Sequence, residues 1–338
     1  MSKKPILKNL KKLNDIKLAQ GIDLSTLSFS YRSEAELKEL GASTSDFGSY
    51  WFNLPDGNSA LFKTYNLLKR MGTKNIRIIN ELLCYQLAKQ VYLPCARYEP
   101  AHVKNNIGLV SYNFLKSDEY TMSLYEFLKI DDELSNNLAD TMQALDIYKE
   151  NGYVFDEREI FENLYKLIIF DTITMQSDRH ASNIHFIFNQ NLPEIKLAPS
   201  FDNEFAFCVD ISQRMFQGEA NPDSKDINDL RDEYSLRAKY FTVFEEIRQS
   251  KGAFINNVKS ICTMAKADKE LGKILNTFLR NFSSVKAFEL LEKKGYQIPD
   301  GYKEYVNNIV SENLDYLKKQ LALVNKDDVE YYKEEVIR

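Results

Sequence analysis

Residues 178–183 read DRHASN and place an acid, two bases, a hydroxyl and an amide between two apolar segments. The preceding segment has the apolar spacing of a long helix, and the following one, NIHFIF, reads as a strand. Asp178 and Asn183 stand five positions apart, and a second acid, Asp202, follows the next hairpin. We therefore expect a polar loop between two buried elements, with a further carboxylate close to it.

Such a set of side chains suits phosphoryl transfer. Mg²⁺ prefers oxygen ligands, takes few of them from the protein and bridges nucleotide phosphates, so an acid and an amide on the two sides of a hairpin could hold it. Another carboxylate would orient the attacking hydroxyl and accept its proton, as the catalytic-loop Asp does in protein kinases. Taken singly, Asp178 also fits a helix cap and Asn183 a turn residue.

The region before this loop offers a cation for the phosphates. Lys63 lies in the strand-like run SALFKTY, and Glu81 lies in the helix predicted over residues 72–91. A strand Lys held by a helix Glu positions nucleotide phosphates in kinases. Upstream, GASTSDFG holds glycines and hydroxyls just before a strand, and its N–H groups could cradle phosphate. The members of this candidate phosphate loop are Gly41, Ser43, Thr44 and Gly48.

Several of these segments resemble one family of kinases. DRHASN resembles the D-x-H-x-x-N pattern of HipA-type kinases, and LAPSFD resembles the motif L-x-P-x-(aromatic)-D that follows their hairpin. The run INELLCYQLAKQVYLPCARYE is similar to their Asn-Glu helix, which leads into a strand. The resemblance covers about residues 41–210. SDRHASNIHFI is also similar to a motif of phosphatidylinositol 3-/4-kinases, but Ser177 stands where that motif has Gly.

The resemblance implies a role for each residue. It makes Asp178 the catalytic base, with Asn183 and Asp202 as Mg²⁺ ligands. Lys63 would contact the phosphates of ATP, and Glu81 would be its partner. His180 would either order the loop by hydrogen bonding or approach the phosphate.

The adenine site is expected at SYNFLK, residues 111–116, where the pattern changes from strand to helix. Backbone groups of this hinge, at Asn113 and Leu115, would hold the base. Arg179 is open to two interpretations, a surface residue or a member of an ion pair that orders the loop.

These elements predict an α+β, two-lobed, protein-kinase-like fold. Residues 1–115 would form a small antiparallel N-lobe with one helix, and residues 116–338 a mostly helical C-lobe with one small hairpin. In the N-lobe, two strands flank the turn NLPDGN, in which Pro fixes φ and Gly accepts positive φ. Asp156 followed by Glu159 predicts the start of the long helix before the polar loop.

Composition limits the partners. A formal net charge of −5 argues against non-specific nucleic-acid binding and disfavours an anionic membrane surface. The sequence contains no apolar run of about 18 residues, so no transmembrane helix is predicted.

The expected substrate is a Ser or Thr hydroxyl of a protein, the chain itself included, and an antitoxin is a further candidate partner. From the resemblance we expect a bacterial, cytoplasmic protein, with secretion into a host left open.

Three alternatives to a Ser/Thr kinase remain at this stage. One is a phosphatidylinositol-type lipid kinase, which a basic face near the cleft would favour. Another is a nucleotide-binding pseudokinase acting as a toxin–antitoxin interaction protein, against which the intact set of polar residues argues. The third is a kinase for small molecules, since a fold does not fix its substrate.

Overall fold

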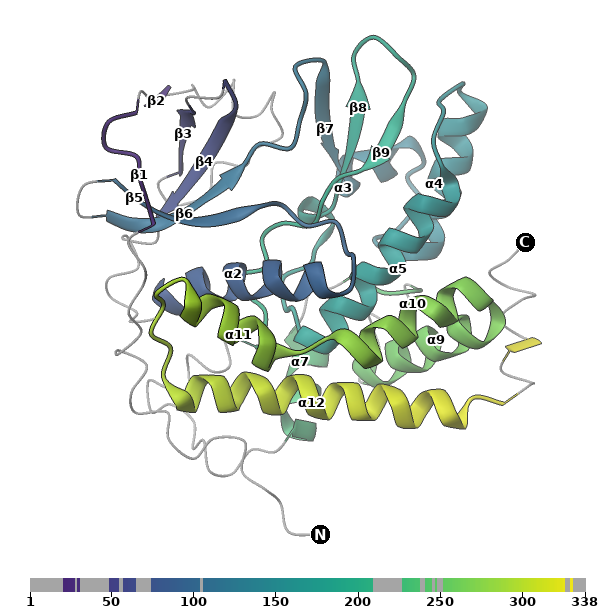
Figure 1. Ribbon diagram of the computed structural model, residues 1–338. Helices are drawn as coiled ribbons and strands as arrows, with labels where there is room; N and C mark the ends of the chain where they lie inside the picture. Colours follow the sequence, from purple (N-terminus) through teal and green to yellow (C-terminus); the bar gives the residue numbers. More distant parts are fainter. Residues whose placement is uncertain are drawn as a thin grey trace.

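A curled sheet of six strands forms the smaller lobe (Figure 1). The computed structural model describes residues 21–27, 29–30, 49–54, 57–64, 74–103, 106–208, 227–237, 241–244, 247, 252–325 and 329–330. The strand order is β1-β5-β6-β4-β3-β2. The strands are β1 (Ile22–Asp23), β2 (Phe29–Ser30), β3 (Ser49–Asn53), β4 (Ser59–Thr64), β5 (Tyr98–Val103) and β6 (Asn106–Tyr112).

The sheet contains one parallel pair of strands. The other pairs are antiparallel, as expected, and β1 runs parallel to β5 at one edge. β1 and β5 are far apart in the chain, and no tight hairpin forces them to run in opposite directions. The predicted hairpin of β3 and β4 is confirmed. In its turn Gly57 has a φ of +84°, which glycine adopts without steric cost.

Gly108 on β6 lets two strands of the sheet approach closely. A Cβ at this position would lie 2.1 Å from the backbone oxygen of Lys63, which belongs to the paired strand β4. Because the contact is with a backbone atom, a change of side-chain conformation cannot relieve it. The strand that carries Lys63 would have to shift.

We therefore expect Gly108→Ala to lower the free energy of unfolding by about 1–3 kcal/mol, the usual cost of overpacking. The measurement is urea unfolding beside Ser111→Ala, a half-buried position on the same strand. The control should change stability by no more than about 0.5 kcal/mol. Equal effects of the two substitutions would contradict the close approach of the strands.

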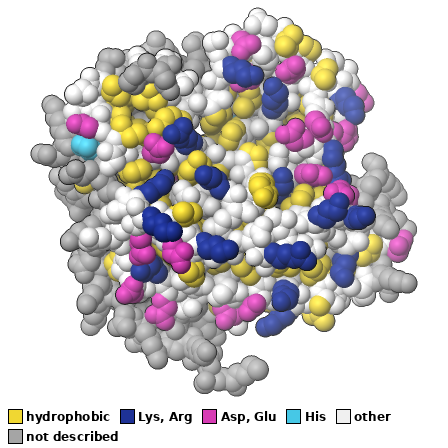
Figure 2. Space-filling view, viewed as in Figure 1, with side chains coloured by type: hydrophobic (Ala, Val, Ile, Leu, Met, Phe, Trp, Pro, Cys, Tyr) yellow, Lys and Arg dark blue, Asp and Glu magenta, His cyan; other side chains and the backbone are white. Residues whose placement is uncertain are grey.

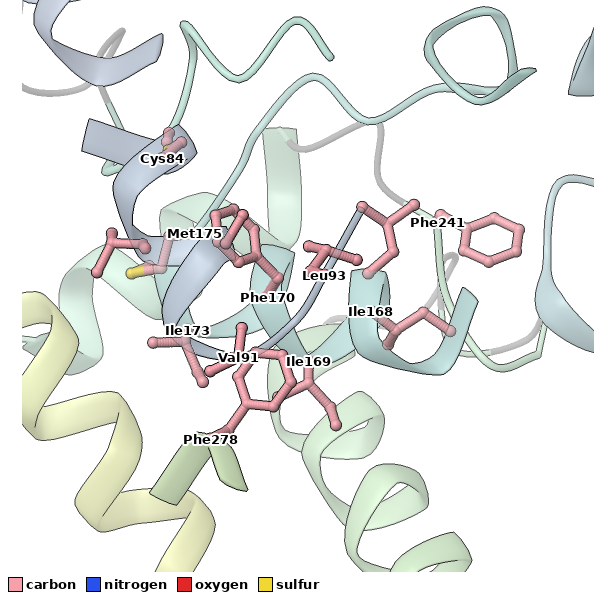
Figure 3. Packing of buried hydrophobic residues seen from close by; sticks show 14 of the residues in the cluster. Cys84, Val91, Leu93, Ile168, Ile169, Phe170, Ile173, Met175, Phe241 and Phe278 are labelled. Carbon is pink, nitrogen blue, oxygen red and sulfur yellow. The ribbon is translucent and has the colours of Figure 1, made fainter. Parts of the chain in front are cut away.

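Helix α2 (Lys74–Gln90) joins the sheet to the helical part of the molecule. Its apolar residues belong to the larger of two buried clusters, together with those of α5 (Glu157–Thr174) and the C-terminal helices. Figure 3 shows Val91 and Leu93, just after α2, together with Ile169 and Phe170 of α5. The smaller cluster lies in the sheet and is Leu24, Phe52, Ala60, Phe62, Ala101 and Val110. α2 is therefore anchored in the large core.

The larger lobe is mostly helical, as expected. Asp156 caps α5, and its side chain accepts a hydrogen bond from the N–H of Glu159. The other helices are α3 (Leu124–Phe127), α4 (Leu138–Glu150), α7 (Ile227–Arg237), α9 (Ala253–Ala267), α10 (Lys269–Asn281), α11 (Ser284–Lys293) and α12 (Asp300–Leu323). α12 lies along the lower side of the molecule in Figure 1, beneath α11.

The predicted small hairpin of this lobe is present and is part of a three-stranded sheet. β8 (His185–Asn189) and β9 (Ile195–Leu197) form the hairpin, and β7 (Glu119–Ser123) pairs with the other side of β8. The expectation that the hairpin is the only β structure of this lobe is wrong, because β7 adds a third strand. β8 is buried along almost its whole length, so its backbone N–H and C=O groups need partners on both edges, and β7 and β9 supply them.

Candidate active site

Lys63 lies between two carboxylates from distant parts of the chain. Its Nζ is 3.4 Å from Oε1 of Glu81 on α2, and it also pairs with Oδ1 of Asp202. The Glu81 side chain is fully buried, and about a third of the Asp202 side chain is exposed (32%). The structure thus brings together the cation predicted on the strand, the acid predicted on the helix and the acid predicted after the hairpin.

Glu81 is held on both of its oxygens. Oε2 accepts a hydrogen bond of 2.9 Å from the N–H of Asn203, and Oε1 faces Lys63. Burial raises the pKa of Glu81 to about 7, and the neighbouring carboxylates of Asp202 and Glu204 add to this, although Lys63 opposes it. The charge on Glu81 is therefore sensitive to pH near neutrality.

This shift predicts how stability changes with pH. The ordinary pKa of Glu81 is 4.5, so between pH 4.5 and about 7 the folded protein binds a proton there that the unfolded chain releases. The contribution of this group to stability is full below pH 4.5 and is lost as the pH rises through about 7. We expect the free energy of unfolding of the wild type, measured relative to Glu81→Gln, to fall between about pH 5 and about pH 8.

The measurement is urea unfolding of both proteins across this range. Glu157→Gln is the control, because Glu157 is exposed at the first turn of α5. A constant difference between wild type and Glu81→Gln would contradict a raised pKa for Glu81.

Asp202 has the backbone conformation of a sharp turn. Its φ is +54°, a left-handed value that costs energy for a residue other than glycine. Its N–H donates to the hydroxyl of Tyr98 over 3.3 Å, and its carbonyl accepts 2.9 Å from Nε2 of Gln176. Burial acts to raise the pKa of Asp202, but the ion pair with Lys63 outweighs it, so the pKa lies below the usual range. This carboxylate is therefore charged and partly open to solvent.

The predicted catalytic loop closes on itself. Nδ2 of Asn183 donates to the backbone oxygen of Asp178 over 2.8 Å, which leaves Oδ1 of Asn183 as the atom that could face a cation. Nδ1 of His180 accepts from the N–H of Ser182 over 3.2 Å, and Nε2 of His180 lies 3.9 Å from Oδ2 of Asp178. The Asp178 side chain is about a third exposed (34%). His180 thus orders the loop, while its second nitrogen faces the predicted base.

Arg179 is the largest of the fully buried side chains in the described part of the chain. It forms a two-pronged ion pair with Asp171 of α5, at 2.9 and 3.3 Å. It also donates to the backbone oxygen of Phe201 over 2.7 Å and to Oδ1 of Asn203 over 2.5 Å. Of the two interpretations left open by the sequence, the structure supports the ion pair that orders the loop. Arg179 connects this loop to the segment that carries Asp202.

The expected hinge residues lie where β6 ends. Asn113 donates its N–H to the backbone oxygen of Ser59 over 2.9 Å, and its Oδ1 accepts the N–H of Leu115 over 3.1 Å. The ring of Phe114 stacks on Phe201, next to Asp202, with centroids 6.5 Å apart. An adenine that accepted a hydrogen bond from Leu115 would therefore displace the Asn113 side chain.

The candidate phosphate loop lies outside the described residues. Its members are Gly41, Ser43, Thr44 and Gly48. Within the described ranges, no group of three or more His, Cys, Asp and Glu side chains is arranged to hold a metal ion. One carboxylate and one amide oxygen, from Asp202 and Asn183, still fit Mg²⁺ that takes its remaining ligands from phosphates and water.

Several residues of the hydrogen-bond network around the site were not predicted as site residues from the sequence. They are Asn80, Asp171, Gln176, Asn203 and Tyr302. Asn80 belongs to the Asn-Glu pair of the helix that resembles HipA-type kinases, and Asn80 and Asp171 are polar residues inside helices with buried apolar residues. No described helix is long and apolar enough to cross a membrane.

Comparison with known proteins supports the fold. No family model and no curated protein matches the chain. Among solved structures, it is similar to the proinflammatory kinase CtkA of Helicobacter pylori, with a TM-score of 0.62 and 14% identity over 90% of this chain and 100% of that one. The toxin–antitoxin protein HipA of Shewanella oneidensis MR-1, solved with HipB and operator DNA, gives a TM-score of 0.39 and 12% identity over 80% of this chain and 60% of that one. The first likeness confirms the predicted two-lobed, kinase-like fold.

Proposed function

We propose that this chain is a kinase that uses ATP and Mg²⁺ to phosphorylate a Ser or Thr hydroxyl of a protein. The observation that carries the proposal is the position of Lys63 between Glu81 and Asp202. In a kinase the strand Lys contacts nucleotide phosphates while a helix Glu holds it. Here the partly exposed Asp202 occupies the side of Lys63 that a phosphate would take.

The chemistry follows from these positions. Asp202 and Oδ1 of Asn183 would hold Mg²⁺, which neutralises charge on the transferred phosphoryl group. Lys63 would exchange its contact with Asp202 for a phosphate oxygen and keep its contact with Glu81. The acceptor oxygen forms a bond to the γ-phosphorus as the bond to ADP breaks, and Asp178 takes the acceptor's proton. His180, facing Asp178, would fix the orientation of that carboxylate.

The proposal of a protein acceptor rests on the resemblance of DRHASN to HipA-type kinases. On the face of the molecule seen in Figure 2, Lys and Arg side chains are interspersed with Asp and Glu side chains. Such a surface lacks the single sign of charge that would favour an anionic lipid surface on this face. The lobe boundary near residue 115 and an antitoxin partner remain predictions.

The test is incubation of the purified protein with γ-labelled ATP and Mg²⁺, alone and with a cell lysate or a lipid extract. We expect label on Ser or Thr of a protein with the wild type and none with Asp202→Ala. Label found only on lipid would replace the protein acceptor by a lipid. Equal labelling by Asp202→Ala would contradict the proposed metal site.

A further inference from the structure

Side chains hold every backbone carbonyl of the segment 201–207, which contains Asp202. The donors come from α2, from the start of the polar loop and from α12. They are Arg179 to Phe201 (2.7 Å), Gln176 to Asp202 (2.9 Å), Cys84 to Asn203 (3.9 Å, through sulfur), Asn80 to Glu204 and to Ala206 (3.0 Å each), Ser177 to Phe205 (3.3 Å) and Tyr305 to Phe207 (2.8 Å).

This segment needs such support because its backbone is strained. Asp202 and Phe207 have positive φ, at +54° and +59°, and so does Cys208 directly after the segment, at +50°. Such a conformation is unfavourable for a residue other than glycine and persists only where the surroundings determine it. The side-chain donors supply that determination, and they keep the Asp202 carboxylate at Lys63.

Asn80 is the central donor of the set. Its side chain is fully buried, and its Nδ2 bonds the carbonyls of Glu204 and Ala206. Its Oδ1 accepts a hydrogen bond from the hydroxyl of Tyr302 on α12. The two carbonyls fix which end of the amide faces them, because the flipped amide would present oxygen to oxygen, and the hydroxyl of Tyr302 then holds Oδ1 from the other side.

Asn80 also stands next to Glu81 in α2. Glu81 holds Lys63 and the N–H of Asn203, so adjacent positions of this helix position both the cation and the acid of the site. Tyr302 and Tyr305 are both buried on α12. One orients Asn80, and the other bonds the carbonyl of Phe207.

We propose that Tyr302 is a positioning residue: through Asn80 it holds the segment 201–207, so that α12 sets the affinity of the site for Mg²⁺. The inference has two halves. The Mg²⁺ half, the effect on Mg²⁺ affinity, deepens the proposed function and rests on it. The structural half, the ordering of the segment by Tyr302, holds without a nucleotide.

The test compares Tyr302→Phe with Tyr165→Phe. Tyr165 is equally buried, and its hydroxyl donates 2.8 Å to the carbonyl of Ile261, away from the segment 201–207. Each substitution removes one buried hydroxyl. We expect similar losses of thermal stability, but only Tyr302→Phe should speed hydrogen exchange of the amides of residues 203–207, by about tenfold, in the nucleotide-free protein.

A second readout is the Kd of Mg²⁺, measured by calorimetry in the presence of a non-hydrolysable ATP analogue. We expect Tyr302→Phe to weaken Mg²⁺ binding about three- to tenfold, the loss expected from one hydrogen bond, and Tyr165→Phe to leave it unchanged. Equal exchange rates and equal Kd values in the two variants would overturn the inference. If Tyr302→Phe speeds exchange but the wild type itself binds no Mg²⁺, the structural half of the inference is supported and the proposed function is refuted.

Discussion

Replacing Asp178 by Asn should slow phosphoryl transfer by about 10²–10⁴-fold and leave nucleotide binding nearly unchanged. Asn is close to Asp in shape, so the loop hydrogen bond from Asn183 to the backbone of Asp178 is retained. The amide cannot accept the proton of the attacking hydroxyl. The loss should therefore appear in the rate at saturating ATP and not in the affinity for the nucleotide.

The measurement is the single-turnover rate of label transfer, with the Kd of an ATP analogue determined in parallel. Asp315→Asn is a control, because Asp315 is an exposed acid on α12. A rate within a factor of about two of wild type would exclude Asp178 as the base. A large loss of nucleotide affinity would instead place Asp178 in binding.

Replacing Arg179 by Met should cost the most stability of the substitutions considered. The change leaves the Asp171 carboxylate buried without its cation, and breaking a buried ion pair in this way typically costs about 3–5 kcal/mol. It also removes a donor from the carbonyl of Phe201 and one from Asn203. We expect a correspondingly large fall in the free energy of unfolding, measured with urea.

Two further variants make this test specific. In the double variant Arg179→Met with Asp171→Leu, the unpaired charge is gone, so part of the loss should be recovered. Lys149→Met removes an ion pair with Glu157 that is exposed to solvent, and because such pairs contribute little, the free energy of unfolding should stay close to that of the wild type. If Arg179→Met cost no more than Lys149→Met, the buried network would not hold the loop as described.

The elements with strong local patterns were predictable from the sequence. The hairpin of β3 and β4 follows from the turn residues, and α2 and α5 follow from apolar spacing and, for α5, from its cap. Lys63, Glu81 and Asp202 were expected to share a site, and their side chains do meet. A local pattern sufficed for Lys63 and Glu81 because each sits on an element of regular geometry, whereas Asp202 was predicted from the motif LAPSFD that follows the hairpin.

The remaining features depend on contacts between distant residues. β7 forms because β8 needs a partner on its second side, and nothing within residues 119–123 indicates that partner. The sequence leaves Arg179 open between a surface residue and a member of an ion pair, and only the positions of Asp171 and Asn203 around it decide between the two. The hydroxyl of Tyr302 meets Asn80 across 222 positions of the chain, a relation that side-chain type and spacing cannot reveal.

The central claim is that Lys63, Glu81, Asp202 and Asn183 together bind a metal-bound nucleotide. The most direct measurement is a crystal structure of the protein grown with Mn²⁺ and a non-hydrolysable ATP analogue, with the metal located by anomalous scattering. We predict a Mn²⁺ peak at ligand distance from Asp202 and from Oδ1 of Asn183, with Lys63 turned from Asp202 to a phosphate oxygen. A nucleotide bound elsewhere, or Lys63 still paired with Asp202 beside a bound nucleotide, would contradict the claim.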